Sequence, residues 1–101
     1  MNKFKLTNAA KEDLIRIHQY GVKQFGMRQA DKYFESFFDH FEMIVERPFS
    51  FESVDLIKQG YRRCVCGVDS IYFRMNDDVV EIMTIIGRQD LGQLPDITKY
   101  D

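Results

Sequence analysis

The chain has no tryptophan, only two prolines and two cysteines, and no long apolar run among its 101 residues. A helix that crosses a membrane needs about 20 consecutive apolar residues, so no such helix is predicted. The first residues, Met1 to Lys5, contain no apolar segment of the kind that a secretory signal requires. These absences predict a cytoplasmic protein that makes no contact with membranes.

The two cysteines, Cys64 and Cys66, are separated by a single residue. In a strand, such positions share one face, which is a poor geometry for a disulfide between them. A cytoplasmic protein also keeps its thiols reduced. A site formed with His18 and His40 would match no zinc-binding spacing. We therefore expect two thiols in the core, no metal and no other cofactor.

Basic charge is not in excess either, because 14 Lys and Arg residues are balanced by 16 Asp and Glu residues, and the formal net charge is −2. A protein that binds nucleic acid nonspecifically usually has a basic surface. The composition therefore argues against strong nonspecific binding of nucleic acid. It does not exclude a local basic patch on the surface. The length fits one domain over residues 1–101 with a modest core.

What the chain does contain is a strong hydrophobic periodicity and many aromatic residues, nine Phe and five Tyr. The second predicted helix shows this best, with an apolar stripe that ends before Pro48. Gly26 is expected to end the helix that precedes it. In chain order, the pattern predicts a strand at 3–7, helices at about 8–25 and 27–47, a loop at 48–59, strands at about 60–66, 70–75 and 79–86, and an irregular tail at about 88–101.

The short connections decide how these elements combine. They make the two helices an antiparallel hairpin and the last three strands an antiparallel meander. Only one sheet is available to bury the aromatic stripe of the second helix. The predicted fold is therefore a two-layer α+β domain of order β-α-α-β-β-β, with an N-terminal helical hairpin packed on one face of a small antiparallel sheet.

Strand parity predicts which side chains face the helices. Cys64, Cys66, Ile71 and Phe73 can cover the helices without burying a charge, whereas the opposite parity would bury arginines. We therefore expect an uncovered face, opposite the helices, that carries arginine and tyrosine side chains. Its predicted members are Tyr61, Arg63, Tyr72, Arg74, Met83 and Arg88.

The last predicted strand is apolar on both faces, which is typical of a central strand or of a strand whose second face a partner covers. Strict alternation places Val80, Ile82, Thr84 and Ile86 on one face and Val79, Glu81, Met83 and Ile85 on the other.

Arginines on a sheet have two possible roles. Arg62 and Arg63 could simply pair with Glu81 or Asp90 across strands. Alternatively, the arginines could bind carboxylates on an acidic protein tail, for which the guanidinium group is well suited. The same choice applies to Phe49 and Phe51, which could be loop anchors or could be covered by a partner.

Nuclease chemistry is the less favoured use of these arginines. RNA cleavage needs general acid and base groups beside the cations that stabilise the phosphate charge. His18 and His40 lie on the predicted helices, away from the arginine face. The remaining candidates, Tyr72, Glu81 and Tyr100, offer no clear acid–base pair.

An ordered set of residues extends over nearly the whole chain. The set comprises Leu6, Thr7, Ala10, Asp13, Leu14, Ile17, Tyr20, Phe25, Gly26, Glu46, Arg47, Pro48, Gly60, Tyr61, Arg62, Arg63, Gly67, Ile71, Tyr72, Phe73, Arg74, Val80, Ile82, Arg88, Gln89 and Asp90. At these spacings the set resembles the ParE toxins of the RelE/ParE superfamily. One departure is Gly87, where related chains often have histidine before the arginine of the last motif.

The resemblance implies the toxin half of a bacterial type II toxin–antitoxin pair, of the kind that stabilises plasmids and arrests growth. It implies neutralisation by a cognate ParD-like antitoxin, an acidic ribbon-helix-helix protein, with DNA reached only through that antitoxin. DNA gyrase is the implied target, inhibited by binding rather than by enzymatic chemistry. A RelE-like ribosome-dependent mRNA endonuclease and a non-toxic antitoxin-binding module stay open as alternatives.

The same resemblance, combined with strand parity, assigns two sets of candidate residues. The expected antitoxin-binding residues are Tyr61, Arg63, Tyr72, Arg74 and Met83, and the expected target-binding residues are Arg88 and Asp90.

Overall fold

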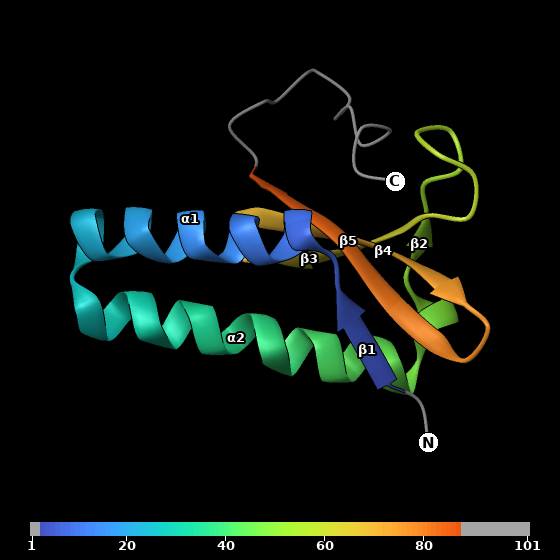
Figure 1. Cartoon of the computed structure of the whole chain (residues 1–101), viewed down its shortest axis with the longest axis horizontal. Helices are drawn as coiled ribbons and strands as arrows, with labels where there is room; N and C mark the ends of the chain where they lie inside the picture. Colours follow the sequence, from blue (N-terminus) through green and yellow to red (C-terminus); the bar gives the residue numbers. More distant parts are fainter. Residues whose placement is uncertain (1–2, 88–101) are drawn as a thin grey trace.

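The structure, a computed structural model, describes residues 3–87, and the fold is given for these residues (Figure 1). The helical hairpin forms one layer and a single sheet forms the other. The elements are β1 (Lys3–Leu6), α1 (Asn8–Phe25), α2 (Met27–Glu46), the short 3-10 helix η1 (Pro48–Ser50), β2 (Glu52–Ser53), β3 (Arg62–Cys66), β4 (Asp69–Asn76) and β5 (Val79–Gly87). The predicted two-layer α+β fold is confirmed.

The sheet has the strand order β1-β5-β4-β3-β2. The strands β2 to β5 run antiparallel to their neighbours, as predicted for the meander, but β1 pairs with β5 in parallel. The sheet is therefore mixed rather than wholly antiparallel. The segment 48–59, predicted as a loop, contains η1 and β2. The sequence did not indicate β2, because a strand of two residues is too short to produce a periodic signal.

The two helices approach closely because small residues meet between them. A Cβ atom added at Gly21 would lie 3.2 Å from the Cβ atom of Ala30, so nothing larger fits without movement. Thr7 caps α1 by accepting a hydrogen bond from the Ala10 amide at 3.0 Å. Gly26, with a φ of 90°, ends α1 and begins the turn into α2, as predicted.

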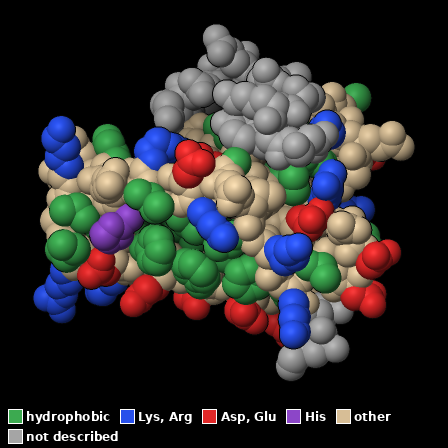
Figure 2. Space-filling model, in the orientation of Figure 1, with side chains coloured by type: hydrophobic (Ala, Val, Ile, Leu, Met, Phe, Trp, Pro, Cys, Tyr) green, Lys and Arg blue, Asp and Glu red, His purple; other side chains and the backbone are tan. Residues whose placement is uncertain are grey.

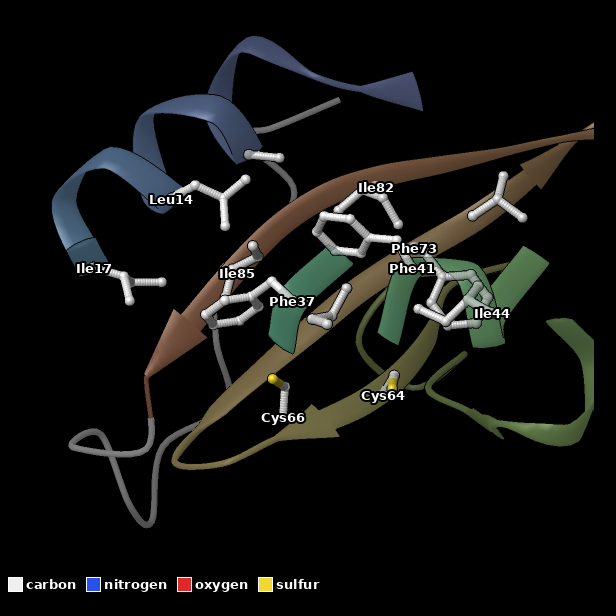
Figure 3. Packing of buried hydrophobic residues seen from close by; sticks show 13 residues of the cluster. Leu14, Ile17, Phe37, Phe41, Ile44, Cys64, Cys66, Phe73, Ile82 and Ile85 are labelled. Atoms are coloured by element: carbon white, nitrogen blue, oxygen red, sulfur yellow. The ribbon is translucent and has the colours of Figure 1, made fainter. Parts of the chain in front are cut away.

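The main core lies between the hairpin and the sheet (Figure 3). Leu14 and Ile17 enter it from α1 and meet the aromatic residues of α2, which include Phe37 and Phe41. The sheet side chains predicted to face the helices are all in this cluster, so that part of the parity argument is confirmed. They are Cys64, Cys66, Ile71 and Phe73.

The outer side of the hairpin has a different character (Figure 2). Apolar side chains gather between the two helices, and acidic side chains follow the edge over α2. Glu35, Asp39 and Glu42 are exposed on that helix and recur at helical spacing. This edge is therefore negative, in contrast to the arginine-bearing face of the sheet.

A β-bulge in β5 changes which of its side chains face the helices. Tyr72 lies opposite Thr84 and Phe73 lies opposite Ile82, so Met83 is the additional residue. Beyond this point the parity is reversed: Ile82 and Ile85 belong to the main core, whereas Met83 and Ile86 lie in a second cluster. The predicted strict alternation is therefore wrong after Ile82, although β5 is a central strand as expected.

The second half of β5 has no neighbouring strand on the β1 side, and side chains from the start of α1 bind its polar groups instead. The strand β1 pairs with only the first half of β5. Beyond it, one carboxylate oxygen of Asp13 accepts hydrogen bonds from the Thr84 hydroxyl at 2.7 Å and from the Ile85 amide at 3.0 Å. The Thr7 hydroxyl donates to the Met83 carbonyl at 2.7 Å. Polar groups at the edge of β5 are satisfied in this way.

A second link joins α2 to the turn between β3 and β4. The Tyr33 hydroxyl lies 2.8 Å from the Cys66 carbonyl oxygen and 2.7 Å from a carboxylate oxygen of Asp69. Gly67 has a φ of 61°, and a Cβ atom there would lie 2.7 Å from the Tyr33 ring. Burial, the hydrogen bond with Asp69 and its charge raise the pKa of Tyr33, so the phenol keeps its proton.

Replacement of Asp13 should destabilise the fold more than replacement of its exposed neighbour. Asp13→Ala leaves the buried Thr84 hydroxyl and the Ile85 amide without this acceptor, at a cost of about 2–4 kcal/mol in the free energy of unfolding. Glu12→Ala, on the exposed side of α1, should cost less than about 0.5 kcal/mol. Urea unfolding of both variants measures the difference, and equal values would contradict this role of Asp13.

Candidate functional site

The face of the sheet opposite the helices is largely covered, not open. Tyr61, Tyr72 and Met83 are only 1%, 3% and 2% exposed. They form a small second cluster, against which Val54 and Ile57 pack. The prediction that these three side chains contribute to an uncovered surface is therefore wrong. The mixed composition of residues 54–60 did not indicate that this segment would fold back onto the sheet.

Hydrogen bonds hold the segment 54–60 as a closed loop. The Val54 amide donates to the Tyr61 carbonyl at 2.8 Å, which joins the two ends of the loop. Within it, the Gly60 amide donates to a carboxylate oxygen of Asp55 at 2.8 Å, and Gly60 has a φ of 86°. The loop therefore has a defined shape over the sheet.

Two of the predicted arginines lie on this face, and each is paired with a glutamate on the adjacent strand. Arg63 Nε lies 2.7 Å from Glu52 Oε1, and Arg74 Nε donates to Glu81 Oε1 at 2.8 Å. Both pairs are directly opposed in the strand register. The arginine side chains are still 38% and 37% exposed, so a partner can reach them. Cross-strand pairing therefore occurs, although the partner of Arg63 among the described residues is Glu52 and not Glu81, and Asp90 lies outside the described residues.

The contact of Arg63 is less complete than that of Arg74. Its Nε atom is shielded from solvent and lies close to Glu52, but the geometry is not that of an aligned hydrogen bond. A shielded donor without an aligned acceptor is in an unfavourable state.

Arg62 is directed to a different part of the surface. Its Nη1 atom donates to the Phe51 carbonyl at 2.7 Å, and its guanidinium carbon lies 5.1 Å from the centroid of the Phe49 ring. Phe51 packs edge-on against Phe73 in the core, with ring centroids 5.9 Å apart. Phe51 is therefore a loop anchor, whereas Phe49 is 69% exposed.

The ionisable groups beneath the arginines are held in single protonation states. The hydrogen bond from Arg74 lowers the pKa of Glu81, against the opposing effect of partial burial. Burial raises the pKa of Tyr61, and the charge of Arg74 opposes this increase only in part. Glu81 is therefore ionised and Tyr61 is protonated at neutral pH.

The other predicted candidates lie elsewhere. His18 Nε2 is 2.7 Å from Asp31 Oδ1 and links the two helices, and His40 Nδ1 is 2.7 Å from the Ser36 carbonyl oxygen. Both histidines lie on the helices, whereas Arg63 and Arg74 lie on strands of the sheet. Within residues 3–87, no three His, Cys, Asp or Glu side chains converge as a metal site, and neither helix could span a bilayer. Arg88 and Asp90 lie outside the described residues.

The pair of Arg74 and Glu81 should make stability depend on pH. Because the folded-state pKa of Glu81 is lowered, its contribution is fully present above the ordinary glutamate value of about 4.3 and is lost as the pH falls below it. At pH 7, Glu81→Gln should lower the free energy of unfolding by about 0.5–1 kcal/mol, and this difference should become smaller at acidic pH. Urea unfolding between neutral and acidic pH measures it. In an Arg74→Met background this loss of unfolding free energy should be smaller, because only Asn76 and Lys5 still stabilise the ionised form of Glu81. A pH-independent difference would contradict the coupling.

Comparison with known proteins agrees with this architecture. Residues 4–92 match the family model described as the ParE toxin of the type II toxin–antitoxin system parDE. Over 86 residues the chain is 31% identical to Toxin ParE1 of Caulobacter vibrioides, covering 85% of this chain and 88% of that protein. A solved structure described as the chromosomal ParDE toxin–antitoxin system from P. aeruginosa has the same fold, with a TM-score of 0.76, 20% identity, and coverage of 86% of this chain and 96% of that chain. The chain belongs to the ParE toxin family of type II toxin–antitoxin systems.

Proposed function

We propose that this chain is a growth-arresting toxin that a ParD-like antitoxin neutralises and that acts in the cytoplasm by inhibiting DNA gyrase. Membership of the ParE family supports the proposal, and so does the description of one solved relative as a ParDE toxin–antitoxin system. DNA is reached only through the antitoxin. The proposed action is binding rather than bond cleavage.

The observation that carries the binding mechanism is the pairing of the arginines with glutamates beside a buried tyrosine. Glu81 is held ionised by Arg74, and Tyr61 is held protonated by burial. General acid–base catalysis is most effective when a group titrates near the working pH, which neither of these does. The arrangement favours recognition of charge over proton transfer.

The proposed antitoxin contacts are Arg63 and Arg74, the two partly exposed arginines that pair with glutamates on adjacent strands. An acidic antitoxin segment would compete with Glu52 and Glu81 for their guanidinium groups. It would also be repelled by the acidic edge of α2, which directs it to the sheet (Figure 2). Tyr61, Tyr72 and Met83 would not contact the antitoxin directly. As buried residues, they would support the position of the arginines on this face. We propose Arg88 and Asp90 as target contacts.

Expression of the chain without its antitoxin should arrest growth, induce the SOS response and block DNA supercoiling. Co-expression with the antitoxin should restore colony formation. Colony counts and a supercoiling assay with purified gyrase measure these effects. Arrest with normal supercoiling and cleaved transcripts would instead favour a ribosome-dependent endonuclease, and unaffected growth would favour a non-toxic binding module.

The two members of the Arg63–Glu52 pair should affect antitoxin binding differently. Arg63→Ala removes a proposed contact and should weaken binding about tenfold, whereas Glu52→Ala removes the competing carboxylate and should leave binding equal or tighter. Isothermal titration calorimetry of the purified proteins measures both. Equal losses in the two variants would mean that the pair is only structural.

A further inference from the structure

The turn that joins α1 to α2 projects beyond the sheet and carries exposed apolar side chains (Figure 1). Phe25 and Met27, on either side of Gly26, are 65% and 59% exposed. Tyr20, within the last two turns of α1, is 61% exposed. None of these three side chains belongs to either core cluster of the described residues, so they add little to the stability of the fold. Exposed aromatic and methionine side chains gathered in this way are typical of a contact surface.

The backbone holds this turn in one shape. The Gly26 amide donates to the Val22 carbonyl at 3.0 Å, and the Gly26 carbonyl accepts from the Ala30 amide at 3.1 Å. The close approach of Gly21 to Ala30 holds the two helices together beside it. A projection that is already ordered loses little conformational freedom when it binds a partner.

The charge at this end of the hairpin is basic, although the whole chain is slightly acidic. Residues 19–30 contain Lys23 and Arg28 but no Asp or Glu. Both side chains are exposed, and neither forms an ion pair within residues 3–87. Asp31, the next carboxylate along α2, is engaged by His18 at 2.7 Å. Basic side chains lie on both sides of the apolar ones at this end of the molecule (Figure 2).

The start of α2 adds to this positive charge. Its first turn contains no acidic residue, and no side chain caps its amides. The positive end of a helix dipole favours a negative charge, whereas Arg28 places a positive charge in this turn. A carboxylate supplied from outside the chain would interact favourably with both the dipole and the Arg28 guanidinium group.

We propose that this turn inserts Phe25 and Met27 into an apolar pocket of a partner protein, and that acidic side chains at the border of the pocket pair with Lys23 and Arg28. We assign the target of the toxin as this partner, so the inference rests on the proposed function. The proposed antitoxin contacts lie on the sheet, in the other layer, and the two partners would therefore use separate surfaces.

The composition of the turn favours a protein pocket over a membrane surface. Membrane anchoring needs a large apolar face or many cations, and this turn offers two apolar side chains beside Gly26 and two cations. In protein interfaces, by contrast, a few buried anchor residues supply most of the affinity. Rigid apolar anchors with basic neighbours therefore match an apolar pocket with an acidic border.

Biolayer interferometry of the full chain with purified gyrase tests the proposal. Met27→Asp should weaken binding about a hundredfold, because the carboxylate would enter an apolar pocket with an acidic border. The same change puts a favourable charge at the start of α2, so the fold should not lose stability. Met43→Asp is the matched control near the opposite end of α2, at a position 49% exposed, and should bind gyrase like the wild type. Circular dichroism and binding to the antitoxin should be equal in all three proteins.

The acidic border is tested by removing the two cations. The double variant Lys23→Gln with Arg28→Gln should bind gyrase about tenfold more weakly than the wild type, mainly through a slower association rate. Added salt should slow association of the wild type and should affect the double variant less. Equal salt dependence in the two proteins would contradict the proposed charge pairing.

The outcomes separate this inference from the proposed function. Normal gyrase binding and growth arrest by Met27→Asp would overturn the inference and leave the proposed function intact. Growth arrest by a wild type that does not bind gyrase would contradict the proposed target, and loss of this arrest in Met27→Asp would still support the turn as the contact with the actual target. A wild type that neither binds gyrase nor arrests growth would overturn both. Co-sedimentation with phosphatidylglycerol vesicles that Met27→Asp abolishes would overturn the protein pocket in favour of an anionic membrane.

Discussion

The Asp13 carboxylate links the helical layer of this fold to the sheet. Its hydrogen bonds to the Thr84 hydroxyl and the Ile85 amide attach α1 to the part of β5 that β1 does not reach. The strand β5 lies between β1 and β4, so this contact attaches α1 to an interior strand of the sheet. The β-bulge at Met83 lies beside it and gives β5 two apolar faces, one toward the helices and one away from them.

The second apolar face of β5 explains the form of the candidate binding surface. Burial of Met83 requires a cover on the side opposite the hairpin, and Val54 and Ile57 supply part of it. Tyr61 and Tyr72 are enclosed with it, and the side chains of Arg63 and Arg74 on the same face stay partly exposed. This face therefore combines a buried apolar base with two partly exposed arginines, each beside a glutamate on the adjacent strand.

Acidic residues recur along the exposed side of α2, whereas Arg63 and Arg74 lie on the sheet, each beside a glutamate of the adjacent strand. The formal net charge of −2 does not reveal this local arrangement. Membership of the ParE family implies a protein partner of the antitoxin kind.

The amino-acid sequence by itself determined the helices, the meander and the set of side chains that faces the hairpin. These follow from local periodicity, from Gly26 and Pro48 at helix ends, and from the cost of burying Arg63 or Arg74 against the helices. Only the tertiary structure decided the parallel pairing of β1, the bulge at Met83 and the covering of Tyr61 by the loop. Each of these depends on contacts between segments distant in the chain, and such contacts leave no local pattern in the order of residues.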